Sequence, residues 1–335
     1  MRNVYNEMFD KEIWEKVNEK NKSIMNDYLL ELKQRKKSNG TITQYKADIR
    51  AFLCYLYKYE NNIYVLDVNK KQLRDFSLFL TYNNNVSNSR HNRFISVVRS
   101  LLYFAEENQE DYGNFEANVA RRLKSLDSKE KRREIHFLKD EDISYIMKKL
   151  EERGEYQESA FLAMLYDSAG RRNEVLQVRK DSFSFERNNT NKVVGKRKKV
   201  FSLLYFDRTK DAVKKWLIAR GKDDVDSLWA VPIPQTRFKR PAREHDVYRW
   251  FLKMKEILKE RDGEFTNFNV HSIRHSALQN YSDGSHYVCK KLGISGFPIE
   301  KLKLLANHSD LTTTSNYLKD NSINEIEGMF GIKIE

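Results

Sequence analysis

The stretch NHSDLTTTSNYLKD (residues 307–320) places His308 nine positions before Tyr317 and sets three consecutive threonines between them. A threonine run of this kind usually caps a helix, because the side-chain oxygen accepts hydrogen bonds from the free N–H groups of the first turn. Taken alone, the stretch predicts a helix start at a polar surface. Whether it carries chemistry depends on the other polar residues of the chain.

The composition indicates a folded, basic protein. The chain has 335 residues, of which 40% are apolar, and its 61 Lys and Arg against 48 Asp and Glu give a formal charge of +13. Its length suits two domains, and its apolar content is sufficient for buried cores. A basic surface attracts polyanions, of which nucleic acid is the commonest. A basic protein without such a partner is the alternative that charge alone leaves open.

The sequence shows no feature of a membrane or secreted protein. No apolar run approaches the roughly 20 residues of a membrane helix, and the start MRNVYNEMFDKEIW lacks the apolar core of a signal peptide. The only cysteines, Cys54 and Cys289, are too few for a disulfide framework or a cysteine-based zinc site. We therefore expect a cytoplasmic protein.

Residues 1–123 are predicted to form a small helical domain. Apolar residues recur at helical spacing from Ile24 to Asn108, and turn-forming residues interrupt them at 37–40, near 67–69 and at 82–89. Four helices account for this pattern. Arg90 and Arg93, at the start of the fourth helix, are candidate DNA contacts.

The charged segment 124–136 has no apolar stripe, and we interpret it as a linker, although a solvated helix extension fits equally well. The second domain is predicted to span residues 137–320. The tail 321–335 carries Ile323, Ile326, Met329 and Phe330 at helical spacing. Such a helix could dock on its own chain or on a neighbouring protomer.

The second domain is predicted to be mostly helical with one β-hairpin. ESAFLAMLYDSAG (158–170) is apolar nearly all round, as a central buried helix would be. In KVVGKRKKVFSLLYF (192–206), short apolar runs flank a basic turn that contains Gly195, which predicts a hairpin with a charged tip. Another helix is expected from Thr209 to Arg220, ending at Gly221. The expected fold class is therefore mainly α with a small β-sheet.

A few polar residues suit phosphodiester chemistry. Arginine side chains can hold phosphate oxygens bidentately, and a tyrosine oxygen can act as a covalent nucleophile. The absence of a carboxylate cluster argues against a Mg²⁺ site, so we expect no metal and no other cofactor. The candidate residues are Arg171, Lys196, His271, Arg274, His308 and Tyr317.

The order and spacing of these residues resemble the tyrosine recombinase (phage integrase) family. SAGRRNEVLQV is similar to the family's first arginine box, VVGKRKKVFSL to its lysine hairpin, and HSIRHS to its His-x-x-Arg-His box. LLANHSDLTTTSNYL is similar to the final box, in which a His precedes the nucleophilic Tyr by nine positions. TITQYKADIRAFLCYL and NRFISVVRSLLYFAEEN resemble the family's helical SAM-like core-binding domain.

The resemblance implies that two domains clamp double-stranded DNA and that Tyr317 attacks a phosphate to form a 3′-phosphotyrosyl bond. Arg171 and Arg274 would bind the phosphate, with His308 in support, and Lys196 would protonate the leaving oxygen. His271 would transfer a proton to or from Tyr317. The resemblance also implies a tetramer on paired DNA sites, in phage or mobile-element integration or excision.

Some framework residues depart from the family pattern. Ala169-Gly170 stands where Gly and an apolar residue are expected, Asn307 replaces a Gly, and an extra segment lies between Arg274 and His308. Such drift also suits a catalytically silent DNA-binding regulator, such as a phage repressor. A type IB DNA topoisomerase is a third interpretation.

Overall fold

The computed structural model describes residues 8–83, 86–113, 115, 118–127, 136–264, 268–315, 317 and 318. The chain divides into two compact units, Met1–Arg132 and Arg133–Glu335. Most of the predicted linker (128–135) and all of the tail 321–335 lie outside the described residues. Among the helices that are described, none is long and apolar enough to cross a membrane.

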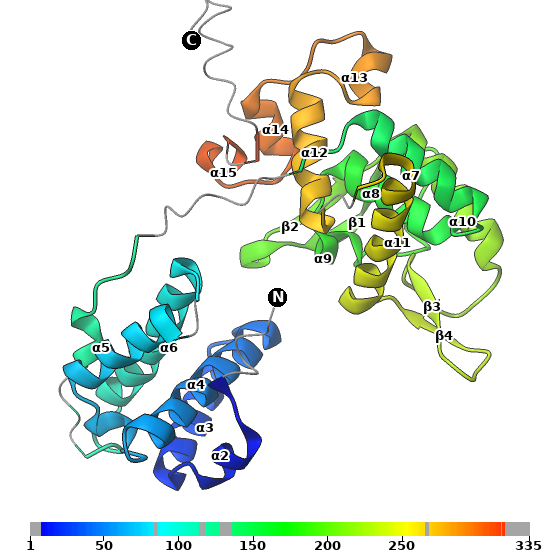
Figure 1. Ribbon diagram of the computed structural model, residues 1–335. Helices are drawn as coiled ribbons and strands as arrows, with labels where there is room; N and C mark the ends of the chain where they lie inside the picture. The colour runs from blue at the N-terminus through cyan, green and yellow to red at the C-terminus, as the bar shows by residue number, and fades with distance from the viewer. Residues whose placement is uncertain are drawn as a thin grey trace, which may run out of the picture. The chain divides into compact units, whose positions relative to one another are not determined.

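The first unit is helical (Figure 1). The four predicted helices are present, and a shorter one, α2, precedes them. A π-helical turn (Phe79–Asn83) extends α5, and short 3-10 turns span Val65–Asp67 and Val119–Arg122. The helices are α2 (Lys11–Lys16), α3 (Glu19–Gln34), α4 (Asn39–Tyr59), α5 (Lys70–Leu78) and α6 (Asn88–Glu107).

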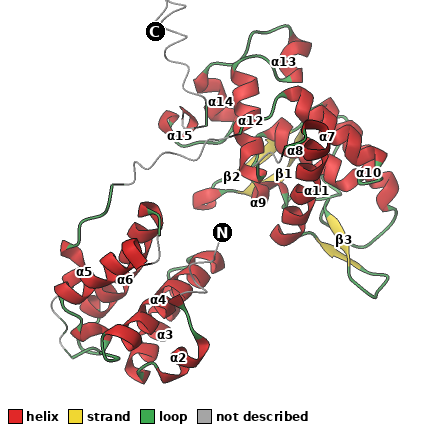
Figure 2. Cartoon of the chain, in the orientation of Figure 1, coloured by secondary structure: helices red, strands yellow, loops and turns green. Residues whose placement is uncertain are grey.

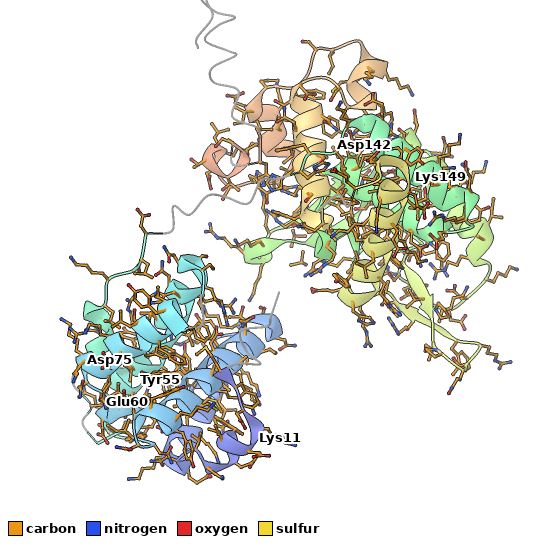
Figure 3. All side chains as sticks on the ribbon, in the orientation of Figure 1. Lys11, Tyr55, Glu60, Asp75, Asp142 and Lys149 are labelled. Atoms are coloured by element: carbon orange, nitrogen blue, oxygen red, sulfur yellow. The ribbon has the colours of Figure 1, made fainter. Side chains whose placement is uncertain are left out.

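Side-chain caps and aromatic packing explain this unit. Ser38, Asn69 and Ser87 each accept a hydrogen bond from a first-turn N–H group, which starts α4, α5 and α6. Phe76 lies at the centre, with its ring 4.7 Å from that of Phe52 and packed against others of the core. Figure 3 shows Tyr55 among these interior side chains and Lys11 at the surface.

The second unit places helices around a buried central one. Figure 2 shows its helices and short strands. The strands form two separate antiparallel hairpins, β1 with β2 and β3 with β4. The elements are α7 (Asp140–Glu152), α8 (Tyr156–Ser168), α9 (Arg172–Val175), β1 (Asn189–Val194), β2 (Val200–Leu204), α10 (Asp207–Arg220), β3 (Ala230–Pro232), β4 (Lys239–Pro241), α11 (Glu244–Asp262), α12 (Val270–Ser282), α13 (Tyr287–Leu292), α14 (Ile299–Leu305) and α15 (Leu311–Ser315).

Helix α8 is the central element, as its apolar sequence predicts. Every residue from Gln157 to Ser168 is buried, and α7, α10 and α12 pack around it. Helix α7 contributes an apolar stripe to this core, and the same helix carries the polar residues Asp142 and Lys149 (Figure 3). The helix ends at Ala169, whose left-handed conformation (φ 46°) turns the chain toward α9.

The β1–β2 hairpin is confirmed, with Val194 opposite Val200 and a 3-10 turn at Lys196–Lys198. Helix α10 begins at Asp207, two residues before the predicted start. Thr209 therefore lies inside the first turn, where it is fully buried and its hydroxyl donates to Asp167. The hairpin β3–β4 and helix α11 were not among the elements that we predicted.

The threonine run does not cap its helix. Asp310 accepts the hydrogen bond from the Thr313 N–H group at 2.7 Å, and the threonines lie inside α15. Thr314 is instead fully buried, and its hydroxyl lies 2.9 Å from His308 Nδ1. The prediction that the threonines form the cap was therefore wrong, because an aspartate before the helix takes that place.

Candidate active site

Arg274 is the buried centre of the candidate site. Asn269 caps the start of α12 and so places His271 and Arg274 one turn apart on that helix. The Arg274 side chain is 1% exposed and donates hydrogen bonds to the carbonyl groups of Ala169 and Ala306. Burial and then the positive charge of Arg171 lower the pKa of Arg274 to about 10, so the guanidinium stays charged at neutral pH.

His308 is held as a neutral imidazole by its two partners. Arg274 Nη2 donates to His308 Nε2 at 2.7 Å, and His308 Nδ1 lies 2.9 Å from the hydroxyl of Thr314. Because a guanidinium can only donate, Nε2 accepts and Nδ1 carries the proton. Burial, and after it the charges of Arg274 and Arg171, lower the pKa of His308 to about 3.

Arg171 is fixed by a buried carboxylate. It precedes α9, where Glu174 Oε2 accepts from the Arg171 N–H group at 2.8 Å and Glu174 Oε1 accepts from Arg171 Nη1 at 2.9 Å. The Arg171 side chain remains 27% exposed, whereas that of Glu174 is 3% exposed. Arg171 therefore has donors left for an anion. Arg172 turns aside and pairs with Glu244 at the start of α11.

Tyr317 lies against three histidine rings. Its ring centroid is 4.3 Å from that of His275, 5.0 Å from His308 and 5.2 Å from His271. The Arg274 guanidinium carbon lies 5.2 Å from the centroid of the same ring. The structure therefore brings His271, Arg274 and His308 to the Tyr317 ring, and Arg171 lines the same groove as His271 and Arg274.

His275 was absent from our candidate list, and it lies closest to the tyrosine ring. It is buried, and its Nδ1 atom lies 3.2 Å from the Tyr317 carbonyl oxygen. Burial lowers the pKa of His275 below its usual value, and the charge of Arg274 lowers it further, while the hydrogen bond to Tyr317 opposes the shift. The second histidine of HSIRHS indicated this residue, since it lies one turn along the helix from His271.

His271 stands at the rim of the site. The residue is exposed, yet the surrounding protein still removes part of its solvent. That desolvation, followed by the charges of His275, Arg274 and Arg171, shifts the pKa of His271 below its ordinary value. A neutral imidazole at the surface can accept a proton from a substrate or a neighbouring hydroxyl.

A groove of about 450 Å³ opens beside these residues. Its lining includes Gly170, Arg171, Lys255, His271 and Arg274 together with the aromatic side chains of Tyr248, Phe251 and Phe268. The groove therefore combines positively charged and aromatic residues. The exposed part of the Arg171 side chain can bind a phosphate group placed there.

The hairpin lysine is not placed against the other candidates. Lys196 is exposed at the hairpin tip, and no hydrogen bond of its side chain is seen among the described residues. Lys199 instead reaches the carbonyl of Asn307 at 3.5 Å, beside His308. The tip contacts the site through Gly195, where an added Cβ would lie 2.9 Å from Glu174 Oε1 and 2.7 Å from the Phe201 ring.

The two candidate DNA contacts of the first unit differ. Arg90 Nη2 lies 2.5 Å from Oδ1 of the fully buried Asp48 side chain, and the Arg90 side chain is 19% exposed. Arg93 Nε lies 3.3 Å from the other oxygen of Asp48, and 42% of its side chain is exposed. Arg93 therefore has more surface to offer to a partner than Arg90.

Two departures from the family pattern occur at left-handed residues. Ala169 (φ 46°) and Asn307 (φ 53°) occupy a region that glycine adopts most easily. Asparagine tolerates this conformation, whereas alanine adopts it at some cost. The turns that glycine would make are therefore kept, and with them the carbonyl of Ala169 that binds Arg274.

The assembled groups suit an anion better than a metal ion. Arg274 and three histidines of lowered pKa lie around the Tyr317 ring, Arg171 lines the groove beside Arg274, and the described residues hold no group of three or more His, Cys, Asp or Glu that could bind a metal. Charged guanidinium groups can offset negative charge that develops on a phosphate during transfer.

Comparisons with known proteins identify the family of both units. The sequence model of the phage integrase family matches residues 136–323, and that of the phage integrase N-terminal SAM-like domain matches residues 25–109. A tyrosine recombinase of Thermosipho africanus is 24% identical over 299 residues, covering 88% of this chain and 93% of the relative.

Two solved structures share the fold. The Tn1549 transposon integrase in complex with circular intermediate DNA aligns with a TM-score of 0.62 and 12% identity, covering 92% of this chain and 98% of that one. A lambda integrase tetramer bound to a Holliday junction aligns with a TM-score of 0.60 and 14% identity, covering 89% and 77%. Since the family model spans more than half of the 335 residues, the protein belongs to the phage integrase family, the tyrosine recombinases of DNA recombination.

Proposed function

We propose that the protein is a site-specific recombinase that cuts and rejoins DNA through a covalent bond to Tyr317. The observation that carries this proposal is the contact of the Tyr317 ring with His271, His275 and His308 beside the buried Arg274 guanidinium. A tyrosine placed next to neutral histidines and fixed positive charge has the partners that a nucleophile of phosphoryl transfer requires.

The cleavage step conserves the phosphodiester. The Tyr317 oxygen forms a bond to phosphorus, its proton passes to His271, and the bond from phosphorus to the 5′-oxygen breaks. Lys196 donates a proton to that leaving oxygen, while Arg171 and Arg274 bind the non-bridging oxygens. The product is a 3′-phosphotyrosyl bond, which a free 5′-hydroxyl can attack to rejoin the strand. No nucleotide is consumed.

Double-stranded DNA is the proposed partner, and the working assembly is a tetramer on paired sites. The formal charge of +13 favours a polyanion. The similar lambda integrase was solved as a tetramer on a Holliday junction and the Tn1549 integrase on DNA of a transposon intermediate. A role in phage or mobile-element integration or excision follows from the same likeness.

An apolar groove of the second unit suits an exchanged tail. It has a volume of about 510 Å³ and is lined mainly by apolar side chains, among them Leu204, Leu292 and Leu304, which are 41%, 61% and 69% exposed. The apolar residues of 321–335 recur at helical spacing and could fill this groove in a neighbouring protomer. Removal of 321–335 should then weaken assembly on paired sites and leave binding to a single site intact.

A nicked DNA substrate tests the proposed chemistry. The nick is placed just beyond the cleavage point, so that a short strand diffuses away after attack and traps the covalent product. The wild-type protein should form an adduct that survives denaturant, also with a metal chelator present. The adduct should map to the peptide that contains Tyr317.

Tyr317→Phe is the matched control, because it removes the oxygen and keeps the ring that packs on His275. It should bind the same DNA and form no adduct. A wild-type protein that binds its site tightly but forms no adduct, together with a Tyr317→Phe variant that keeps full biological function, would favour the DNA-binding regulator.

A further inference from the structure

A buried aspartate joins four helices, α8, α10, α12 and α13. Asp167 is fully buried in the last turn of α8. Its Oδ2 atom accepts three hydrogen bonds, from the Phe206 N–H group at 2.9 Å, the Thr209 hydroxyl at 2.6 Å and the Tyr287 hydroxyl at 3.0 Å. Its backbone carbonyl accepts from the Tyr281 hydroxyl at 2.8 Å. A carboxylate used by three donors at once fixes the elements that carry them.

Asp167 lies just before the turn that binds Arg274 and carries Arg171. Two residues later, the carbonyl of Ala169 accepts from Arg274, and Arg171, two residues after that, is the N-cap of α9. Ala169 is held in a left-handed conformation, which costs energy for a residue other than glycine. Neighbouring structure must therefore hold this turn. Ser168 does so locally, because its hydroxyl accepts from the Gly170 N–H group at 3.0 Å, and Asp167, the residue before it, joins this end of α8 to other helices.

One of the three donors, Tyr287, comes from the loop between α12 and α14 (residues 283–298), which contains the short helix α13. The loop is closed at its base, where the Phe297 N–H group donates to the Tyr281 carbonyl at 2.8 Å. At the same place, a Cβ on Gly296 would lie 2.1 Å from the Ser282 carbonyl oxygen, so the start and the end of the loop are in backbone contact. The loop is therefore a preformed unit that presents Tyr287.

Tyr287 itself is firmly placed in this loop. Its ring lies 3.9 Å from the guanidinium carbon of Arg208, and its hydroxyl oxygen accepts from the backbone N–H group of Arg208 at 3.2 Å. Its own N–H group donates to Asp140, which also binds the Arg208 guanidinium in a bidentate ion pair. The Tyr287 hydroxyl is therefore oriented toward Asp167 before any ligand arrives.

We propose that Asp167 is a positioning residue, through which the loop carrying Tyr287 holds the Ala169–Arg171 turn in the geometry that aligns Arg171 and Arg274. The proposal rests on the proposed strand-cleavage activity only for its kinetic consequence. A misplacement of about 1 Å in a positioning element can reduce a rate by about a hundredfold.

The Oδ1 atom of Asp167 makes a discriminating variant available. It is buried and has no hydrogen-bond partner among the described residues. Asp167→Asn can therefore keep an oxygen toward the three donors and place its NH₂ group at the unpartnered side. Asp167→Ala removes the acceptor, and Tyr287→Phe removes one donor without creating a large cavity. Lys290→Ala is the matched control, because Lys290 lies in the same loop and makes an exposed pair with Glu141.

The experiment measures three quantities for each full-length variant at a temperature well below unfolding. These are the rate of adduct formation on nicked DNA, the affinity for the same DNA, and the hydrogen exchange of the Arg171 amide, which donates to Glu174. Asp167→Ala should slow adduct formation by about ten- to a hundredfold, and Tyr287→Phe by about three- to tenfold. Both should speed exchange at Arg171 and change DNA affinity less than about threefold, while Asp167→Asn and Lys290→Ala stay near wild type.

The outcomes separate this proposal from the proposed function. If Tyr287→Phe folds and leaves both the rate and the Arg171 exchange unchanged, Asp167 does not act through the loop and the proposal is overturned. Loss of activity in Asp167→Asn equal to that in Asp167→Ala would also overturn it, since the acceptor would then not be what matters. If the wild-type protein forms no adduct, the proposed function fails, and exchange at Arg171 still decides the positioning role.

Discussion

Arg274 Nη2 donates a hydrogen bond to His308 Nε2 at 2.7 Å, and this contact fixes the proton of His308 on the opposite nitrogen. We therefore expect His308 to be neutral, with its proton on Nδ1 and shared with Thr314. The pKa of His308, lowered to about 3, keeps it neutral through the physiological range. Nitrogen NMR of the imidazole should show the Nδ1–H tautomer at about pH 6.

Thr314→Val is the control for this tautomer. It removes the hydroxyl that receives the proton and keeps the shape of the side chain. The Nδ1 resonance should then move, and the Nε2 resonance should keep the shift of an acceptor. A protonated His308 at about pH 6 in the wild-type protein would contradict the assignment.

Replacement of either site arginine should affect cleavage more than binding. Arg171→Ala and Arg274→Ala should each slow adduct formation by about a hundred- to a thousandfold, because each removes charge that stabilises the transition state. DNA affinity should change by less than about tenfold, since binding is spread over many phosphates. Arg172→Ala is the neighbouring control and should stay near wild type, because Arg172 pairs with Glu244.

Arg274 is buried, so its alanine variant needs a folding check. Arg274→Lys keeps the charge with fewer donors, and it should fold while losing most of the rate. If binding and cleavage fell in equal proportion for both arginines, the assignment of Arg171 and Arg274 to the reacting phosphate would be wrong.

The two hairpin lysines can be distinguished by the leaving group. If Lys196 supplies the proton, Lys196→Ala should slow cleavage by about a hundredfold or more, within the range for general acids. A substrate with sulfur at the leaving 5′-position needs no such proton and should restore the rate. Lys199→Ala should show a smaller defect with both substrates, because Lys199 contacts the Asn307 carbonyl. Rescue of Lys199→Ala alone would move the role to Lys199.

The sequence was most informative where a local pattern determines structure. The apolar run of 158–170 predicted the buried α8, and the basic turn around Gly195 predicted β1–β2. The spacing of His271 and Arg274 predicted that both lie on one helix. These features depend on neighbours within a few residues, which periodicity and turn composition describe.

Contacts between distant residues could not be predicted in this way. His275 lies 42 residues before Tyr317, yet their rings stack, and Asp167 meets Tyr287 across 120 residues. Strands β3 and β4 have three residues each, which is too short to show an alternating pattern. Thr209 was predicted to cap α10, but its hydroxyl donates to Asp167, 42 residues earlier in the chain, and local sequence does not reveal this contact.

DNA binding should depend steeply on salt, and Arg93 should contribute more than Arg90. If roughly six to ten phosphates are contacted, affinity should fall by about three to five powers of ten between roughly 50 and 200 mM salt.

Arg93→Ala should reduce the slope of log affinity against log salt by about one. Arg90→Ala should instead lower stability by roughly 1–3 kcal/mol, because Asp48 loses its closer partner inside the unit. Equal slopes for wild type and Arg93→Ala would remove Arg93 from the DNA interface.

Ionisation of Asp167 should make the stability of the protein depend on pH. Burial, opposed by hydrogen bonds from Thr209 and Phe206, raises the pKa of Asp167 to about 6, above its ordinary value of 3.8. The folded state therefore binds more protons between these values, and stability is lost as pH rises through them. A pKa difference of about two corresponds to roughly 3 kcal/mol of ionisation cost above about pH 7.

Asp167→Asn removes this cost, because the amide does not ionise. Its stability advantage over wild type should therefore grow by roughly 1 kcal/mol between about pH 5 and about pH 7.5. Chemical unfolding of both proteins at each pH measures the difference, and the subtraction cancels the histidines, whose lowered pKa values act in the opposite direction. Burial lowers the pKa of His286 to about 2, so this residue destabilises the folded state as pH falls below about 6.5, and it does so equally in both proteins. If the advantage of Asp167→Asn were the same at both pH values, Asp167 would not titrate in this range, and the pKa of its carboxyl group in the folded protein would not be raised to about 6.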